Sequence, residues 1–218
     1  MDVYEYRTLT IARGAWGKLA RSYFGALAEA TKQAGGTPFL LCAGMIGFAS
    51  DEGVLMRAWQ DSDALAAQGA RTMSAAEGVT GSSVERLVPT ARPVTNAAPT
   101  EPGVYAHRWF WIQPQDQDEF VRISDEGVWP FFEADGCRIV GLWRSMEPGP
   151  LAKLLLITRY RDVAHWERTR PQEPEPPPGA DERLYAMSRN AVRRRAELTQ
   201  RSIVRLTRIL LPETLSAT

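Results

Sequence analysis

The sequence has few of the residues and motifs that most often carry recognisable chemistry. It has only two histidines and two cysteines in 218 residues, with no Cys-x-x-Cys or Cys/His spacing typical of zinc sites. It also lacks the Gly-x-Gly-x-x-Gly, Walker and Gly-x-Ser-x-Gly motifs, which disfavours nucleotide-dependent enzymes and covalent hydrolases. We therefore predict no metal site, and we expect Cys42 and Cys137 to be reduced, buried thiols of a cytoplasmic protein.

An excess of charge of one sign and long apolar runs are also missing. The 26 Lys and Arg balance the 26 Asp and Glu, so no global field favours nucleic acid or an anionic membrane. No run approaches the roughly 18 apolar residues that span a bilayer, and the first residues do not resemble a secretory signal. We expect neither nucleic acid nor a membrane as a partner. The arginines of segment 193–208 are interpreted as a solvated helix face, since no aromatic residues are interleaved with them.

The chain repeats itself with a shift of 101 residues. Val3-Tyr4-x-x-Arg7-x-x-x-Ile11 recurs as Val104-Tyr105-x-x-Arg108-x-x-x-Ile112, and the same shift places Gly35 on Gly136, Trp59 on Tyr160 and Asp61 on Asp162. Four segments in one register predict two copies of one structural unit. Residues kept in both copies are expected to serve the fold, whereas residues present in one copy indicate where a site is to be sought.

Each copy predicts the order strand, helix, strand, strand, helix. The first copy has strand patterns at 2–11, 38–49 and 54–59 and helical patterns at 14–34 and 62–73. The second copy has strand patterns at 104–112, 139–145 and 153–160, a helical pattern at 116–133 and a short helix starting near Asp162.

These elements predict two units, residues 1–73 and 103–218. Segment 74–102 is rich in Ser, Thr, Gly, Ala and Pro and is predicted to be a linker, in which 83–87 is compatible with one turn or strand. Inside the second unit, the proline-rich segment 171–179 is predicted to be a surface insert. Apolar spacing predicts one long helix over 180–211.

The order of elements suits a ferredoxin-like unit, whose sheet is covered by helices on one face and leaves the other face apolar. Because an exposed apolar face is unfavourable, the two sheets are expected to pack against each other. The predicted fold class is therefore α+β: two tandem ferredoxin-like units that form an α+β barrel, with an extra long C-terminal helix.

Some of these segments resemble one known family. The opening Val3-Tyr4-Glu5-Tyr6-Arg7-Thr8 resembles the start of NIPSNAP proteins, and the second copy is similar to their later pattern at Gly141-Leu142-Trp143, Gly149-Pro150-Leu151, Tyr160, Arg168 and Arg170. The resemblance covers residues 2–73 and 103–170. It implies the dimeric α+β barrel superfamily, which includes cofactor-free monooxygenases and cyclases of polyketide pathways and haem-binding chlorite dismutases. It also implies a homodimer.

The candidate site comes from the residues in which the copies differ. Both histidines and five of the seven tryptophans lie in the second copy, where His107, Trp109, Trp143 and Arg144 replace Tyr6, Thr8, Cys42 and Ala43. A histidine among aromatic side chains is suited to proton transfer in an apolar pocket, although a hydrogen-bonded core histidine has the same pattern. Tyr105 and Arg108 match Tyr4 and Arg7 and are interpreted as support for the fold, with a role in clamping a substrate carboxylate as the alternative.

The resulting hypothesis is a cofactor-independent enzyme that acts on an aromatic or largely apolar metabolite between the sheet and the helices of the second unit. His107 would transfer a proton, Tyr6 or Tyr160 would donate hydrogen bonds, and Arg144 would hold an oxyanion or carboxylate, in a pocket shaped by Trp109 and Trp143. The reaction would be a cyclisation, isomerisation, lyase reaction or cofactor-free oxygenation. One alternative is a non-catalytic binding or assembly module, and another is a haem enzyme with His165 as axial ligand.

Overall fold

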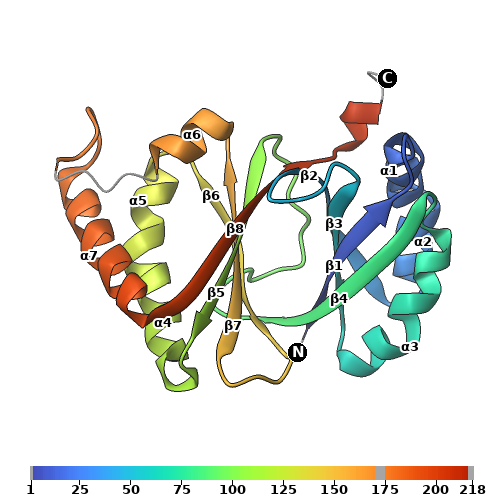
Figure 1. Ribbon diagram of the computed structural model, residues 1–218, viewed down its shortest axis with the longest axis horizontal. Helices are drawn as coiled ribbons and strands as arrows, with labels where there is room; N and C mark the ends of the chain where they lie inside the picture. The colour runs from blue at the N-terminus through green and yellow to red at the C-terminus, as the bar shows by residue number, and fades with distance from the viewer. Residues whose placement is uncertain (1, 170–174, 216–218) are drawn as a thin grey trace.

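The backbone hydrogen bonds of eight strands close into a barrel within the described residues, 2–169 and 175–215, of the computed structural model (Figure 1). Neighbouring strands follow the order β1-β3-β2-β8-β5-β7-β6-β4 and every neighbouring pair is antiparallel. The strands are β1 (Val3–Ile11), β2 (Gly36–Ile46), β3 (Glu52–Trp59), β4 (Val79–Pro89), β5 (Val104–Ile112), β6 (Arg138–Ser145), β7 (Ala152–Tyr160) and β8 (Thr199–Ile209).

Helices cover the outside of the barrel in two groups on opposite sides (Figure 1). One group is α1 (Trp16–Phe24), α2 (Ala26–Gln33) and α3 (Ser62–Thr72), and the other is α4 (Gln117–Ile123), α5 (Trp129–Ala134), α6 (Val163–Arg168) and α7 (Glu182–Leu198). Within the described ranges, no helix combines the length and apolarity required to cross a membrane.

The repeated residues have the same structural role in both copies. Val3 pairs with Trp59 across β1 and β3, and Val104 pairs with Tyr160 across β5 and β7, so the two ladders share one register at a shift of 101. Asp61 and Asp162 both cap a helix by accepting a hydrogen bond from the backbone N–H three residues later. Gly35 and Gly136 end a helix with a positive φ, which glycine adopts without strain.

Strand alternation divides the side chains between two environments. The barrel interior is an aromatic and aliphatic core in which Tyr4 packs edge-on against Phe39 and Trp143, with ring centroids 5.1 and 5.4 Å apart. The outward-facing side chains of each half pack under the helices as separate clusters around Leu9 and Phe110. The predicted α+β barrel is confirmed, and the β4–β6 and β2–β8 pairings close it by joining the two sheets edge to edge.

Two predicted segments are corrected. The predicted linker 74–102 contains β4, which pairs with β1 and β6. The predicted helix 180–211 ends at Leu198, and the chain continues as β8. In both segments polar residues hid the strand, because these strands expose several side chains to solvent. The division of the chain into two units stays a prediction.

Smaller differences concern the two long helices and the insert. The predicted helix 14–34 is interrupted at Gly25, between α1 and α2. The predicted helix 116–133 contains a π-helical turn, η3 (Ser124–Val128), between α4 and α5. Residues 171–174 of the predicted insert 171–179 lie outside the described residues.

A buried ion-pair network fills the space between sheet and helices in the first half. Glu5 is fully buried and accepts hydrogen bonds from Arg7 Nε at 2.6 Å, Arg57 Nε at 2.9 Å and the indole N–H of Trp59 at 3.2 Å. Arg57 also donates to the hydroxyl of Thr72 and to the carbonyl of Gly69. One carboxylate therefore neutralises two buried guanidinium groups, which is the condition under which buried charge is tolerated.

We predict that Glu5→Gln lowers the free energy of unfolding by about 3–5 kcal/mol, because it leaves two buried cations without a counter-charge. Urea denaturation followed by circular dichroism measures the change. The matched control is Glu29→Gln, which breaks only the exposed pair with Lys32 and should cost much less. Equal losses in the two variants would contradict the role assigned to Glu5.

Candidate ligand-binding site

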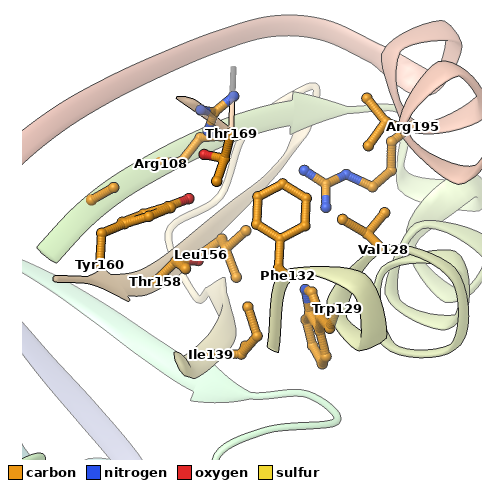
Figure 2. A pocket seen from close by; sticks show the side chains of 12 residues that line it. Arg108, Val128, Trp129, Phe132, Ile139, Leu156, Thr158, Tyr160, Thr169 and Arg195 are labelled. Carbon is orange, nitrogen blue, oxygen red and sulfur yellow. The ribbon is translucent and has the colours of Figure 1, made fainter. Parts of the chain in front are cut away.

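A cavity of ≈170 Å³ lies between the sheet and the helices of the second half (Figure 2). In Figure 2 the guanidinium group of Arg195 points from α7 toward the ring of Phe132, and the hydroxyl of Tyr160 points in from the other side. The cavity is lined by Ala106, Arg108, Val128, Trp129, Phe132, Ile139, Leu156, Thr158, Tyr160, Thr169, Val192 and Arg195.

Local sequence explains why these side chains meet. Strand alternation turns Ala106 and Arg108 outward from β5, while Val128 is the last residue of the π-helical turn η3 that leads into α5. A Cβ at Gly127 would lie 2.5 Å from the Cβ of Ala191, so glycine allows α7 to approach η3 closely. Arg195 is one helical turn beyond Ala191 and therefore faces the same side.

The side chain of Arg195 is buried without its usual partners. Arg195 is 8% exposed, and its Nε and Nη1 have no hydrogen-bond partner in the described part of the chain. Its guanidinium carbon lies 4.9 Å from the ring centre of Phe110 and 5.2 Å from that of Phe120. Burial and the charge of Arg108 lower the pKa of Arg195 to about 9, so the group remains a cation at neutral pH. A buried cation with unused N–H donors favours an anionic ligand.

In the first half, the Glu5 network fills the space that corresponds to this cavity. With the shift of 101, Ala106 corresponds to Glu5, Thr158 to Arg57 and Tyr160 to Trp59. The second half thus keeps the arginine at Arg108 but has no carboxylate at 106, and its cavity occupies the place of the Glu5 network. Among the described residues, the second half thus has alanine at the position where the first half supplies the carboxylate of Glu5.

Tyr160, which the sequence analysis selected, contributes a hydroxyl group to the cavity. Burial, reinforced by Cys137, raises its pKa to about 12. The hydroxyl is therefore protonated at neutral pH and can donate a hydrogen bond.

The structure separates the predicted site residues. Arg108 and Tyr160 line the sheet–helix cavity, and Arg144 is an exposed residue on open depressions at the outer surface. The prediction that His107 borders the sheet–helix cavity is wrong, because alternation along β5 turns it to the opposite face from Arg108. The other predicted residues that point into the barrel are Tyr6, Tyr105, Trp109 and Trp143.

His107 has the environment of a core histidine. It is fully buried, its Nε2 lies 3.0 Å from the Thr207 hydroxyl, and the ring centroid of Tyr6 is 5.7 Å away. Because the Thr207 hydroxyl donates to the carbonyl of Tyr105, it accepts from Nε2–H of His107. Nδ1 has no partner within the described residues. Burial first, and Arg205 second, lower the pKa of His107 to about 3, so it is neutral at physiological pH.

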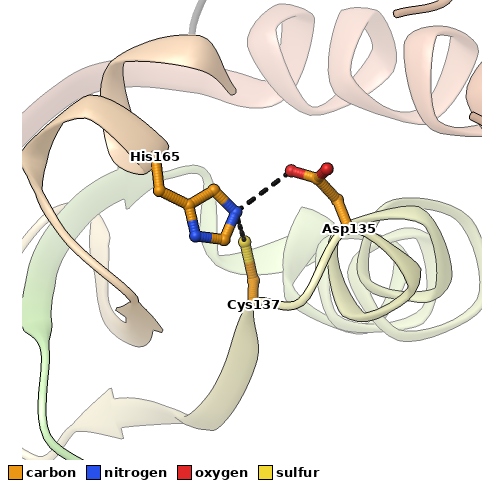
Figure 3. A group of neighbouring side chains, drawn as sticks. All are labelled: Asp135, Cys137 and His165. Carbon is orange, nitrogen blue, oxygen red and sulfur yellow. Dashed lines mark hydrogen bonds and ion pairs between the residues drawn. The ribbon is translucent and has the colours of Figure 1, made fainter. Parts of the chain in front are cut away.

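A cluster that the sequence did not reveal joins Asp135, Cys137 and His165 (Figure 3). Nε2 of His165 lies 3.1 Å from Asp135 Oδ2 and 3.6 Å from Cys137 Sγ, while Nδ1 accepts the backbone N–H of Arg161. Since Nδ1 accepts, the ring hydrogen sits on Nε2, which therefore acts as a donor and not as a metal ligand. Burial also raises the pKa of the Cys137 thiol to about 12, so the sulfur is not a thiolate.

In this geometry His165 is not suited to be an axial haem ligand. Both ring nitrogens are engaged, and His165 is not among the residues that line the cavity. The cavity itself is also smaller than the roughly 300 Å³ at the lower end for drug-sized ligands.

Arg195 was the main residue that sequence reasoning missed. Segment 193–208 was interpreted as a solvated face, yet Arg195 is four residues after Ala191 and three before Leu198, both buried. That spacing places it on the apolar stripe of α7. The position of a single arginine within the Arg193-Arg194-Arg195 run was the available signal.

Comparisons with known proteins support the fold. No family model and no curated protein matches the chain. Among solved structures, a candidate monooxygenase from Lactobacillus acidophilus has a TM-score of 0.60 at 10% identity, over 94% of this chain and 92% of that chain. An anthrone oxidase-like protein has a TM-score of 0.57 at 14% identity, over 96% and 91%. A chlorite dismutase variant from Candidatus Nitrospira defluvii has a TM-score of 0.56 at 10% identity, over 99% and 94%.

At these identities the likeness shows the fold alone, which is the α+β barrel of ferredoxin-like units. A NIPSNAP family protein from Agrobacterium tumefaciens covers 57% of this chain with a TM-score of 0.36, so the narrower resemblance gains no support. The expected homodimer stays a prediction.

We predict that burial of neutral His107 makes the protein less stable in mild acid. The unfolded histidine, with a pKa near 6.5, binds a proton that the folded one refuses down to about pH 3, so stability falls as pH drops below 6.5. Between about pH 7.5 and 4.5, wild type should lose on the order of 3 kcal/mol more than His107→Gln in urea denaturation. Parallel pH profiles of the two proteins would contradict this assignment.

We also predict that Arg195→Met raises the free energy of unfolding by about 1–3 kcal/mol, since methionine fills the space without a desolvated charge. The control is Arg194→Met on the same helix, which loses only exposed ion pairs with Glu119 and Glu197 and should not be stabilised. Thermal and urea denaturation report both effects. A clear loss of stability in Arg195→Met would mean that the guanidinium has a structural partner.

Proposed function

We propose that the protein is a small-molecule enzyme that binds a one-ring aromatic or enolisable anion in the sheet–helix cavity and stabilises its negative charge. The fold, which it shares with a candidate monooxygenase and an anthrone oxidase-like protein, supports this class of activity. The cavity of ≈170 Å³ supports the ligand size, because an engineered cavity of about 150 Å³ holds benzene.

The observation that carries the proposal is the buried Arg195 with unused N–H donors beside a cavity that replaces the Glu5 network. An anionic oxygen of the ligand would accept from Arg195 where a carboxylate of the chain serves in the first half. Arg108 adds positive potential, and Tyr160 supplies a neutral hydroxyl donor on the far side. The aromatic walls, Trp129 and Phe132, suit a flat ring.

The proposed chemistry follows from the same groups. No carboxylate, imidazole, amine or thiol lines the cavity among the described residues, so the substrate must be acidic enough to release its proton to solvent water once bound. The cations lower the pKa of a phenol or enol by favouring its ionised form. Fixed donors that hold the resulting phenolate or enolate lower the barrier to a later step, as an oxyanion hole does. Isomerisation, cyclisation and oxygenation of such an anion are the reaction classes proposed.

The lack of a base among the described lining residues also favours a second candidate function, which is binding without catalysis. In that case the cavity would hold a stable anion such as a carboxylate and release it unchanged. The two functions differ in whether a weakly acidic ligand is ionised on binding.

We predict that the protein lowers the apparent pKa of bound 4-nitrophenol, because Arg195 stabilises the phenolate. Absorbance of the phenolate during a pH titration measures the shift with and without saturating protein. Arg195→Met should abolish the shift and weaken benzoate binding by about tenfold or more, which corresponds to one charge-assisted hydrogen bond. Arg194→Met should behave as wild type.

The possible results separate the alternatives. An unchanged 4-nitrophenol pKa together with tight benzoate binding would support the binding protein and contradict the enzyme. Failure of both ligands to distinguish Arg195→Met from wild type would contradict the site itself.

A further inference from the structure

A second cavity, of ≈340 Å³, opens at one end of the barrel, where β1 and β5 end and β7 and β8 begin. It lies on the inner face of the strands, the face opposite to the sheet–helix cavity. Its lining residues are Tyr6, Thr8, Ser83, Val84, Glu85, Trp109, Trp111, Lys153, Arg201, Ile203 and Arg205. None of them belongs to the site proposed above.

We propose that this barrel mouth binds an anionic molecule with a flat system of about two fused aromatic rings. The charges, the aromatic walls and the volume of the cavity each support part of this description.

The charges of the mouth are unbalanced. Lys153 pairs with Glu85 at 2.6 Å, and the same carboxylate accepts from the hydroxyl of Ser145. Neither Arg201 nor Arg205 forms an ion pair with any described residue. Three cations thus face one carboxylate whose acceptors are already in use, which leaves an excess of positive charge for an anionic group.

The aromatic wall is flanked by the same cations. The Nζ of Lys153 lies 4.2 Å from the ring centre of Trp109, and the guanidinium of Arg201 lies 4.9 Å from that of Trp111. Tyr6 packs edge-on against Trp109, with ring centroids 5.4 Å apart, and its ring also lies 5.7 Å from that of His107. Flat indole and phenol rings next to N–H donors suit a planar ligand that carries a carboxylate.

Comparison of the two halves shows that the indole rings of this wall are specific to the second copy. Thr8 pairs with Ser83 in the first half, whereas Trp109 pairs with Ile203 in the second. Glu85, the partner of Tyr6, corresponds to Arg205, the partner of His107. At these paired positions the first half has the small Thr8 and Ser83 and the acidic Glu85, and the second half has an indole, Ile203 and the basic Arg205. Residues of both halves line the same opening, so the small side chains of the first half leave space in front of the aromatic side chains of the second half.

The volume distinguishes the two cavities by ligand size. The mouth is about twice as large as the sheet–helix cavity, which is suited to one ring. A two-ring anion should therefore bind at the mouth and be excluded from the smaller cavity.

The test is isothermal titration calorimetry of the full chain with 2-naphthoate. The double variant Arg201→Gln/Arg205→Gln should weaken binding by about tenfold or more, since it removes the two unpaired cations. The matched control is Arg208→Gln, an exposed arginine on the same strand, which should leave binding unchanged. The neutral analogue 2-naphthalenemethanol should bind much more weakly than the anion.

Arg195→Met and excess benzoate separate this proposal from the function proposed above. Binding of 2-naphthoate should be unaffected by either, whether or not the sheet–helix cavity binds its own ligand. Equal affinity of wild type and the double variant, or loss of binding in Arg195→Met, would overturn the proposal.

Discussion

Closure of the barrel is the constraint on which the rest of the structure depends. The pairing of β2 with β8 and of β4 with β6 joins the two halves and leaves no free sheet edge among these strands. Closure also gives every strand a true inside and outside, so consecutive residues enter different environments. Along β5, His107 and Trp109 face the interior core, while Ala106 and Arg108 face the helices. A substitution on one face of this strand can therefore create a site without disturbing the other.

The parts of the fold that repeat were predictable, and the parts that join the repeats were not. The ladder of Val3 with Trp59 and its counterpart of Val104 with Tyr160 follow from strong β-branched and aromatic patterns in one register. The strands β4 and β8 are joined to the opposite half, so their identity depends on contacts distant in sequence. In β8, Ile203, Val204 and Thr207 were a β-signal that the helical spacing of apolar residues concealed.

Sequence reasoning selected a half of the chain that contains a cavity, but it selected few of the residues that line the cavity. The argument from differences between the copies favoured the second half, and Arg108 and Tyr160 do line a cavity there. The argument from differences failed for His107, because a change of residue type shows that the copies diverged but does not show on which side of the strand a ligand would lie. Arg195 was missed for a related reason. The burial of one arginine in a run of three depends on the close approach of α7 to η3 at Gly127, which no local pattern contains.

The two halves differ at one side chain that separates a filled structural network from a cavity. In the first half, Glu5 compensates Arg7 and Arg57, and the space between sheet and helices is filled. With Ala106 at the matching position, the carboxylate and its volume disappear together, while a buried guanidinium is retained on α7. Such an arrangement costs stability when empty, because desolvation of the cation is not repaid. Its retention is understandable if a ligand supplies the charge, since binding then offsets the desolvation already incurred and the N–H donors need no rearrangement. The buried cation of Arg195 is thus the physical feature that distinguishes this cavity from an ordinary packing defect, which would be lined by apolar side chains alone.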